Sequence, residues 1–405
     1  MNTKNNIIVA LSRVPYPSDK GDKLRAYYQL LELVKKYNVY LVCLTDSAVD
    51  TTSIAHLESF CKEVHVIKLG LITRLLNLMF GLINTVPFQT NYFRSKKMDA
   101  LIADLSKTKE IALCYVQLIR LHKNLPFDSS TKYYLDYMDA FSLGMKKRAK
   151  KSGFFKRHLV ALEARRLAHF EPAIAPYYDG YSIITEKDSK AFSNLVPLPI
   201  DVIPNGITND FLKVNPGEGV FDIVFLGNMG YFPNVEAAKY LVGKILPLIH
   251  KTMPDAKVCL VGTNPAPEVR KLESEHVIVT GFVEDVSEYL AKSKVFVAPL
   301  FTGQGLQNKL LESLAVGIPV ITTPLAYAAF ENPENSGMLM ADCPEEFAKF
   351  AIELIQNKSE RTRLGDIGQV FVKTSYDWAK STEQLIERFE EIIHGEDGTD
   401  RIGSH

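Results

Sequence analysis

The chain has 405 residues, 46% of them hydrophobic, and a single hydrophobic core rarely grows beyond about 250–300 residues, so we expect two domains. Its 47 basic and 47 acidic residues balance, which gives no electrostatic reason to expect a nucleic-acid partner. The first residues lack a signal-peptide pattern, and no long uninterrupted apolar stretch suggests a transmembrane span. The scattered cysteines favour a reducing compartment, the cytoplasm, with buried thiols: they are Cys43, Cys61, Cys114, Cys259 and Cys343.

Short apolar segments, typical of buried parallel strands, alternate with helical patterns along the first half of the chain. This alternation predicts a doubly wound α/β sheet, in which ligands bind beyond the carboxyl ends of the strands. The predicted strands span residues 7–12, 39–44, 64–69, 111–117, 132–137 and 181–185. A long helix is predicted over residues 159–175, interrupted at Pro172.

A polar glycine turn follows the first predicted strand and leads into a helical pattern that starts at Leu24. The turn contains Gly21, Asp22 and Lys23, and Arg25 follows in the helix. Strand, glycine loop and helix in this order can bring a backbone close to a ligand. An ordinary turn with solvated charges is the alternative interpretation.

Residues 71–83 are nearly all apolar, with Arg74 and Asn77 as the main interruptions. The segment is too short to span a bilayer. We expect a buried helix here, and a helix that lies against a membrane or guards an acceptor groove is the alternative.

The densest basic run is KKRAKKSGFFKRH, which begins at Lys146, contains Phe154 and Phe155, and reaches Arg157 and His158. Such a cluster attracts anionic lipid headgroups by roughly 1 kcal/mol for each charge near the surface. A solvated helix face followed by a linker explains the same residues. Both interpretations stay open from the sequence.

Prolines and glycines near Pro204 and Gly206 mark a linker between the two halves. We predict an N-terminal Rossmann-like domain over residues 1–203, a C-terminal Rossmann-like domain over 204–374, an amphipathic final helix over 375–395 and a polar tail over 396–405. The strands of the second domain are predicted over residues 221–226, 257–262, 277–280, 295–299 and 318–322.

The stretch KVFVAPLFTGQGLQNKLLESLAVGIPVITT, residues 294–323, predicts strand, glycine loop, helix and strand in that order. Gly303 and Gly305 would let a ligand reach the loop backbone, and the first amides of the helix favour an anion such as a diphosphate. Lys309 and Glu312 are three residues apart and share one helix face. A cation with a carboxylate one turn deeper suits a diphosphate joined to the diol of a ribose.

Several motifs in this order resemble family-4 glycosyltransferases of the GT-B fold. Gln304 and Glu312, with seven residues between them, stand where that family usually has two glutamates, and LLESLAVGIPVITT resembles the region that follows the second. Further segments resemble the branch of exopolysaccharide sugar transferases whose helix begins with Gln-Asn-Lys: they are PYPSDKGDKLRAYYQLLELVKKYNVYLVCL, RRLAHFEPAIAPYYDGYSIITEKD, PNGI, FLGNMGYFPNVEAAKYL and VTGFVEDV.

The resemblance implies two Rossmann-like parallel-sheet domains that face each other across a cleft, with a nucleotide-diphosphate sugar as the donor. It places the first glycine turn on the acceptor side, where Gly21 approaches the transferred sugar or its phosphate. Family members commonly have an arginine where this chain has Asn228, so we expect Lys309 to replace that cation. Where the family has a His-Asp pair, this chain has Met138 and Asp139.

On this basis the expected catalytic residues are Lys309, Gln304 and Asp139. The expected donor-binding residues are Glu312, Gly227, Asn228, Gly305, Leu306, Gln307, Asn308 and Phe282, the last near the nucleotide base. The expected acceptor and phosphate loop consists of Gly21, Asp22, Lys23 and Arg25.

The resemblance implies retaining transfer to a polysaccharide or lipid-linked acceptor in cell-surface, exopolysaccharide or capsule biosynthesis. Negative charge develops on the leaving diphosphate, so donors aimed at it speed the reaction. No Asp-x-Asp motif occurs, so we expect no metal and no cofactor. The expected partners are the nucleotide sugar and a glycan or lipid-linked acceptor. If the basic run from Lys146 to Arg157 binds anionic headgroups, an anionic membrane surface is a further partner and the protein is peripheral to the membrane.

Three alternatives remain. Gln304 and Asn228 depart from the family pattern, which is also typical of a non-catalytic partner subunit that binds a nucleotide sugar. Gly303-x-Gly305-x-x-Asn308 partly matches a dinucleotide fingerprint, as in a dehydrogenase, although the third glycine is missing. A sugar-nucleotide epimerase of the same fold is the third.

Overall fold

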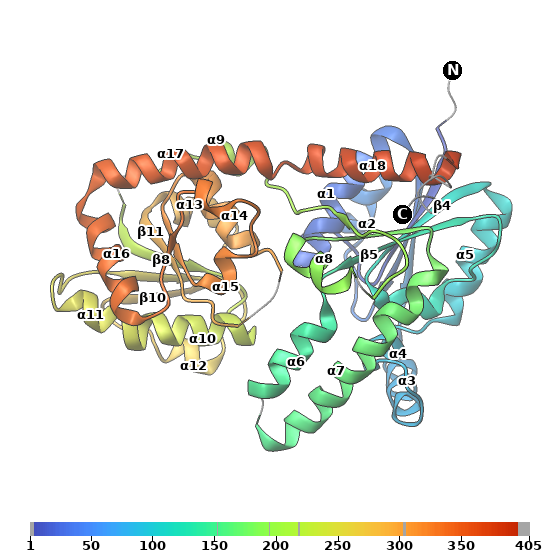
Figure 1. Cartoon of the computed structure of the whole chain (residues 1–405), viewed down its shortest axis with the longest axis horizontal. Helices are drawn as coiled ribbons and strands as arrows, with labels where there is room; N and C mark the ends of the chain where they lie inside the picture. The colour runs from blue at the N-terminus through green and yellow to red at the C-terminus, as the bar shows by residue number, and fades with distance from the viewer. Residues whose placement is uncertain (1–3, 152, 194, 218, 303–304, 396–405) are drawn as a thin grey trace, which may run out of the picture. The chain divides into compact units, whose positions relative to one another are not determined.

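The computed structural model describes residues 4–151, 153–193, 195–217, 219–302 and 305–395. The chain divides into two compact units, which Figure 1 shows with the helices and strands labelled. Unit 1 comprises Met1–Pro204 and Trp378–His405, and unit 2 comprises Asn205–Asp377. The boundaries expected from the sequence lie at residues 203/204 and 374/375.

Unit 1 is built on a parallel sheet of seven strands in the order β3-β2-β1-β4-β5-β6-β7. Along the interior strand β1, Ile7, Val9 and Leu11 pack on one face of the sheet, while Ile8 and Ala10 pack on the other. Both faces are therefore buried, which explains why the strand is a continuous apolar run. The strands are β1 Asn6–Leu11, β2 Asn38–Thr45, β3 Glu63–Lys68, β4 Ile111–Gln117, β5 Lys132–Met138, β6 Gly180–Ile183 and β7 Asp201–Val202.

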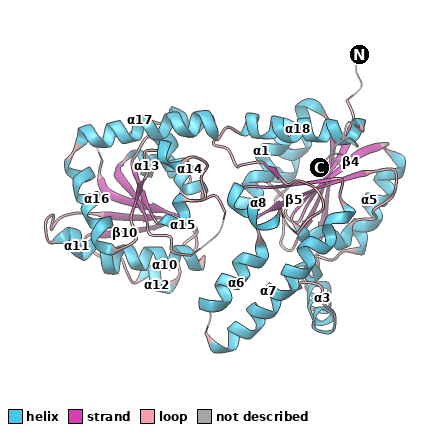
Figure 2. Cartoon of the chain, in the orientation of Figure 1, coloured by secondary structure: helices cyan, strands magenta, loops and turns pink. Residues whose placement is uncertain are grey.

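Helices cover both faces of this sheet, as Figure 2 shows by its colours. The final helix α18 (Trp378–His394) packs on it through Leu385, Phe389 and Ile392. The other helices are α1 Gly21–Lys36, α2 Thr51–Glu58, α3 Leu71–Ile83, α4 Phe88–Tyr92, α5 Lys96–Thr108, α6 Phe141–Lys151, α7 Phe154–Ile174 and α8 Glu186–Phe192, with 3₁₀ turns at Ile119–Asn124 and Ala175–Tyr177.

Helix α3 has the predicted bounds, but the expectation that it is buried is wrong. Gly81 is its one buried residue, and most of its large apolar side chains are exposed. The reason is that Arg74 and Asn77 occupy the side that faces the protein, where both form hydrogen bonds.

The long helix also differs from its prediction. Helix α7 begins at Phe154 and continues past Pro172 to Ile174, because this proline lies in the last turn. The basic run covers the end of α6 and the start of α7, and the described side chains of Lys146, Lys147 and Lys150 are exposed.

Unit 2 is built on a parallel sheet of six strands in the order β10-β9-β8-β11-β12-β13. The strands are β8 Phe221–Leu226, β9 Val258–Val261, β10 Val277–Gly281, β11 Ser293–Ala298, β12 Val320–Thr322 and β13 Leu339–Met340. The helices are α9 Asn209–Lys213, α10 Phe232–Tyr240, α11 Leu246–His250, α12 Pro267–Arg270, α13 Val286–Ala291, α14 Asn308–Val316, α15 Pro324–Tyr327, α16 Pro344–Gln356 and α17 Lys358–Ser375, with a π-helical turn at Leu241–Ile245 and a 3₁₀ turn at Pro333–Asn335.

Within the described part of the chain, none of the helices has both the length and the apolar character needed to cross a membrane.

Candidate functional site

In each unit the order of the strands reverses at one place. Strands β8, β9 and β10 follow one another toward one edge of the unit 2 sheet, and β11, β12 and β13 toward the other, so the reversal lies between β8 and β11. In unit 1 it lies between β1 and β4. Ligands of open parallel sheets bind beyond the carboxyl ends of the strands at such a point. The loops that follow these four strands are therefore the places to search.

In unit 2, the loops after β8 and β9 touch through two glycines. The Gly227 amide donates to the Val261 carbonyl oxygen at 3.0 Å. A Cβ on Gly262 would lie 1.7 Å from the Gly227 carbonyl oxygen, so a side chain at position 262 is excluded. Both glycines have positive φ angles, 154° at Gly227 and 147° at Gly262.

Lys309 lies in the first turn of α14, and its side chain reaches the loop after β8. Its ammonium donates to Asn234 Oδ1 and lies 5.1 Å from the centroid of the Phe225 ring. The other end of the same amide, Asn234 Nδ2, donates to the Asn228 carbonyl oxygen at 2.9 Å. The orientation of the Asn234 amide is thereby fixed, with its oxygen toward the cation.

The missing side chain at Gly227 makes room for this arrangement. A Cβ there would lie 2.5 Å from Asn234 Nδ2 and 3.0 Å from the Lys309 ammonium. The loop glycine is thus required by the packing of a cation and an amide against the backbone.

Glu312 follows one turn later in α14 and is half-buried, like Lys309. Burial lowers the pKa of Lys309 to about 8 and raises the pKa of Glu312 to about 7, and in each case the opposite charge of the other residue acts against the shift. No hydrogen bond to the Glu312 carboxylate comes from the residues described here. The carboxylate is therefore free to accept hydrogen bonds from a ligand.

The structure brings most of the other predicted donor-binding residues to the same loops of unit 2. Asn228 Oδ1 accepts from the Gly230 amide at 3.0 Å, so its side chain shapes the turn after β8. Leu306 is buried, and Gln307 is the residue that precedes α14. Asn308 Oδ1 accepts from Asn205 Nδ2 at 3.0 Å.

Of the remaining predicted residues, Phe282 is exposed, Gly305 is partly buried, and Gln304 lies outside the described residues. Phe282 follows β10 and is 73% exposed. Gly305, with a φ angle of 68°, precedes the start of α14. Gln304 and the neighbouring Gly303 lie outside the described residues.

The cluster in unit 2 has the chemistry of a site for an anion joined to a polyol. Helix α14 begins without a side-chain cap, so its first amides are available to an anion, as is the nearby ammonium. The Glu312 carboxylate can accept hydrogen bonds from hydroxyl groups. Sequence reasoning did not include Asn234 in this site, because a polar residue in the first turn of a helix gives no signal of a lysine partner far along the chain.

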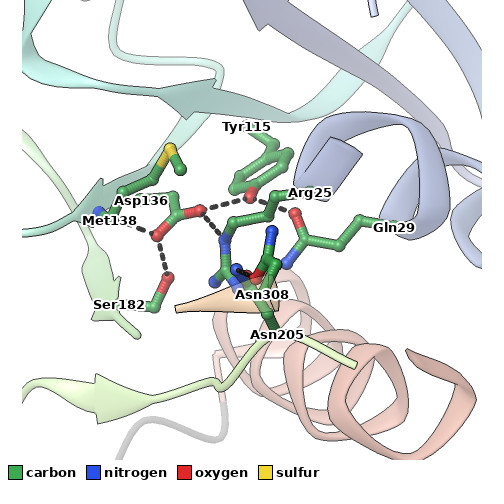
Figure 3. A network of polar contacts seen from close by, with 8 residues as sticks. All are labelled: Arg25, Gln29, Tyr115, Asp136, Met138, Ser182, Asn205 and Asn308. Carbon is green, nitrogen blue, oxygen red and sulfur yellow. Dashed lines mark hydrogen bonds and ion pairs between the residues drawn. The ribbon is translucent and has the colours of Figure 1, made fainter. Parts of the chain in front are cut away.

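In unit 1, Arg25 does not lie in a ligand loop. Its side chain is fully buried, and its Nε donates to Asp136 Oδ2 at 2.6 Å (Figure 3). The Asp136 carboxylate also accepts from Ser182 Oγ at 3.2 Å and from the Met138 amide at 3.1 Å, and the Tyr115 hydroxyl lies 3.0 Å from it. Arg25 therefore belongs to the hydrogen-bond network of the core.

Asp139 lies just beyond the end of β5, where Met138 has a φ angle of 63°. Its Oδ1 atom is buried and has no hydrogen-bond partner among the described residues. Burial, together with the negative charges of Asp188 and Asp136, raises the pKa of Asp139 to about 7, and the positive charge of Arg25 acts against this shift. An unpaired buried carboxyl oxygen is costly, so this group suits a ligand that donates a hydrogen bond.

Two arginines that the sequence analysis missed stand beyond β1 and β4. Arg13 Nη1 pairs with Asp22 Oδ2 at 2.5 Å, and Arg120 Nη1 lies 3.7 Å from the same oxygen. The Arg120 guanidinium also donates a hydrogen bond to Gln89. Burial lowers the pKa of Arg120 to about 10. Their position directly after the two strands at the reversal was the signal that could have revealed them.

The rest of the predicted acceptor loop is placed at the start of α1. A Cβ on Gly21 would meet no heavy atom within 4 Å, so the space beside it is open. Lys23 pairs with Asp19.

His122, which follows β4, packs against aromatic rings, and burial lowers its pKa to about 3, which indicates a structural role.

Within the described ranges, one group of His, Cys, Asp and Glu side chains lies close enough to share a metal ion. It consists of Asp342, Cys343 and Glu346, whose ligand atoms lie within 4.8 Å of one another. Asp342 and Glu346 are exposed, and the Asp342 amide donates to Glu346 at the start of α16, as in an ordinary helix cap.

Comparison with known proteins adds independent support. The family model for "Glycosyl transferases group 1" matches residues 220–357, which lie in unit 2. A protein of Klebsiella pneumoniae described as "Uncharacterized 44.6 kDa protein in cps region" is 21% identical over 388 residues, 92% of this chain and 97% of the relative. A phosphatidyl-myo-inositol mannosyltransferase of Mycobacterium leprae is 24% identical over 204 residues, 47% of this chain and 53% of the relative.

Solved structures share the fold over nearly the whole chain. Sucrose-phosphate synthase from Thermosynechococcus elongatus superposes with a TM-score of 0.67 at 14% identity, covering 96% of this chain and 100% of the other. The Anabaena protein HepE in complex with UDP-glucose superposes with a TM-score of 0.65 at 13% identity, covering 95% and 99%.

The predicted family resemblance and fold class are confirmed by the family match in unit 2, by the relatives and by the two parallel sheets. The chain is a glycosyltransferase with the GT-B fold, and residues 220–357 of its unit 2 are similar to the group 1 glycosyl transferases.

Proposed function

We propose that this glycosyltransferase moves a sugar from a nucleotide-diphosphate donor to a polysaccharide or lipid-linked acceptor, with retention of the anomeric configuration and without a divalent metal or other cofactor. The observation that carries the donor half is the Lys309 ammonium, held beside Gly227 by Asn234 in the first turn of α14.

The donor diphosphate binds at Lys309 and at the first amides of α14. Negative charge grows on the diphosphate as the glycosidic bond breaks, so a fixed cation there lowers the barrier. Lys309 is mostly protonated at neutral pH because its pKa, about 8, still lies above 7. An approaching diphosphate raises that pKa again and secures the charge.

The nucleoside and the sugar engage the neighbouring residues. Glu312 accepts hydrogen bonds from the ribose hydroxyls, which favour its ionised form and so oppose the effect of burial. Phe282, exposed after β10, offers a ring on which the nucleotide base stacks. Gln304 meets hydroxyls of the transferred sugar, where an amide stabilises developing positive charge less well than a carboxylate does.

The acceptor binds at the strand ends of unit 1. Asp139 supplies a carboxyl oxygen with no hydrogen bond from the described residues, which suits a hydroxyl donor. Gly21 leaves open space beside the start of α1, with Asp22 and Lys23 next to it. Arg13 and Arg120 add positive charge for a phosphate or an acidic sugar on the acceptor.

The relative from a cps region supports a role in exopolysaccharide or capsule biosynthesis, and the UDP-glucose complex of HepE makes UDP-sugars the first donors to test. We place the reaction in the cytoplasm, at the inner face of the membrane. The basic run that begins at Lys146 and reaches Arg157 contributes there by attracting anionic headgroups.

Steady-state kinetics with a panel of nucleotide sugars, with and without EDTA, test the proposal. Lys309→Ala should lower turnover by roughly 10²–10³-fold, the cost of removing one stabilising donor, and change donor affinity less. Glu312→Ala should weaken nucleotide binding by roughly tenfold, as expected for lost hydrogen bonds to a charged group. The control Lys239→Ala, at an exposed lysine of α10, should behave like the natural chain.

Unchanged kinetics in both site variants would remove these assignments. Tight nucleotide binding without turnover of any donor and acceptor would instead favour the non-catalytic partner subunit, and loss of turnover in EDTA would contradict the metal-independent mechanism.

A further inference from the structure

Helix α3 (Leu71–Ile83) is amphipathic in the opposite sense to an ordinary surface helix, with its polar side toward the protein and its apolar side outward. We propose that α3 is a membrane anchor, which lies along a bilayer surface rich in anionic headgroups and inserts its apolar face there. The anchor deepens the membrane location given in the proposed function, and it rests on the residues of α3, which differ from those of the basic run and of the transfer site.

The outward face of α3 is almost purely apolar. Ile83, Ile72 and Leu82 are 81%, 74% and 67% exposed. Such a concentration is unusual, because folded monomers rarely leave contiguous apolar patches of this kind in water without a function. The exposed large side chains of α3 are Leu71, Ile72, Leu75, Leu76, Met79, Phe80, Leu82 and Ile83.

The inward face of α3 is held by polar contacts that leave the helix no freedom to turn its apolar side toward the protein. Arg74 Nη1 donates to the Tyr92 hydroxyl at 2.9 Å, and Asn77 Nδ2 donates to the Arg94 carbonyl oxygen at 2.9 Å. At Gly81, a Cβ would lie 3.1 Å from the Phe88 ring, so this side already packs closely on α4. Rotation about the helix axis would break these bonds, so the outward orientation is built in.

The dimensions favour a helix that lies on the membrane. Its 13 residues make a helix about 20 Å long, shorter than the hydrocarbon core of about 30 Å. A short helix with one apolar face and the rest of the protein on its other face buries that face at the boundary between headgroups and acyl chains.

The charges near α3 are mostly basic and favour anionic headgroups, while Asp46 pairs with Arg74 of the helix at 3.7 Å. Between Glu63 and Asp99 the sequence contains no acidic residue, while lysines and arginines occur at Lys68, Arg74, Arg94, Lys96 and Lys97.

Three cations collect next to the helix. Arg94, Lys96 and Lys123 line a hollow of about 340 Å³ whose one acidic member is Asp99. The Arg94 guanidinium also lies 5.9 Å from the centroid of the exposed Phe80 ring, so the hollow adjoins the apolar face. Apolar insertion and binding of a phosphate headgroup can therefore occur side by side.

A bilayer fits these features better than a second copy of the chain. In a twofold contact through α3, each basic hollow would approach its own equivalent, and like charges would repel. An anionic bilayer offers both an apolar layer and the opposite charge.

Flotation of the full chain with lipid vesicles tests the proposal. The natural chain should bind vesicles of phosphatidylcholine with phosphatidylglycerol more tightly than vesicles of phosphatidylcholine alone, and salt should reduce the difference. The variant Ile72→Ser with Met79→Ser changes two side chains that are 74% and 64% exposed on the apolar face, and it should bind both kinds of vesicle at least about tenfold more weakly. Lys96→Gln with Lys123→Gln should weaken the preference for phosphatidylglycerol, and an unchanged preference would contradict the role of the basic hollow.

Matched controls come from unit 2. Val220→Ser with Val370→Ser changes two apolar side chains that are 69% and 63% exposed, and it should bind vesicles like the natural chain. Lys213→Gln with Lys239→Gln removes two exposed lysines and is the control for the lysine variant. It should keep the preference of the natural chain for phosphatidylglycerol. Thermal unfolding and nucleotide binding should be unchanged in the α3 variant, which separates loss of membrane binding from failure of the proposed transfer.

Three results would overturn the proposal. The first is a natural chain that binds neither kind of vesicle, and the second is an α3 variant that binds as well as the natural chain. The third is a dimer, seen by sedimentation in the absence of lipid, that the α3 variant dissociates, because the occupant of the face would then be a second copy.

Discussion

Two pairs of opposite charge, a fully buried one in unit 1 and a half-buried one in unit 2, differ in how completely their carboxylates are bonded. In unit 1, the Asp136 carboxylate is contacted by Arg25, Ser182 and the Met138 amide, and also lies near the Tyr115 hydroxyl. In unit 2, Glu312 has the attraction of Lys309 and no hydrogen bond from a described residue.

The difference separates a structural charge from one that is prepared for a ligand. A buried carboxylate with every lone pair occupied contributes to one fixed core arrangement and has nothing left to offer a substrate. A carboxylate whose hydrogen-bonding capacity is unused suffers from burial, as the raised pKa of Glu312 indicates, and gains when hydroxyls arrive. The presence of two opposite charges alone does not distinguish the two pairs.

Removal of one partner of the unit 1 pair should have the largest effect on stability. Arg25→Met leaves Asp136 charged and buried without its main partner, so the free energy of unfolding should fall by about 3–5 kcal/mol. Denaturant unfolding measures the change. The control Lys132→Met lies on the same unit in the exposed pair with Asp179 and should cost at most about 1 kcal/mol. Equal effects of the two variants would show that the network around Asp136 is not a structural unit.

A smaller loss of stability is expected when a side chain is added at Gly227, against which Lys309 and Asn234 pack. In Gly227→Ala, the new Cβ displaces both the Asn234 amide and the Lys309 ammonium from the loop backbone. The free energy of unfolding should fall by about 1–3 kcal/mol, and the affinity for the donor should fall by roughly tenfold. The control is Gly243→Ala in the π-helical turn, where a Cβ meets nothing within 4 Å. Calorimetric titration with a nucleotide sugar measures both, and an unaffected Gly227→Ala variant would contradict the packing argument.

The smallest effect is a dependence of donor binding on pH. Binding needs Glu312 ionised, which requires a pH above about 7, and Lys309 protonated, which requires a pH below about 8. Affinity for a nucleotide sugar should therefore be highest between these values and fall on both sides, by at most tenfold per pH unit.

The two limbs of this profile can be assigned separately. Glu312→Gln should remove the decline at low pH, because an amide does not titrate, and Lys309→Met should remove the decline at high pH. A profile that keeps both limbs in both variants would assign the titration to other groups.

The sequence predicted the sheets well because their strands are buried on both faces and so appear as continuous apolar runs. Strand β4 (Ile111–Gln117) and strand β8 (Phe221–Leu226) have the bounds predicted for them. The short edge strands β7 and β13 were missed, since two residues give no recognisable pattern.

The candidate site was harder to predict, because local pattern does not show which partner a charge will have. Lys309 and Glu312 could be paired from their spacing on one helix. Arg25, only a few residues from Gly21, was grouped with the glycine turn, yet the helix carries its side chain into the core toward Asp136, which is 111 residues away in sequence. The same limit concealed the outward direction of the apolar face of α3.

Unit 1 is built from two separate segments of the chain, and this affects the order in which the two units can fold during synthesis. Its core includes Leu385, Phe389 and Ile392 of α18, which pack with residues of β1 and β4, yet all of unit 2 is encoded between the two parts. A ribosome therefore releases every residue of unit 2 before it supplies the last helix of unit 1. Until α18 has been synthesised, part of one face of the unit 1 sheet stays uncovered. Unit 2 can therefore complete its fold before unit 1 does.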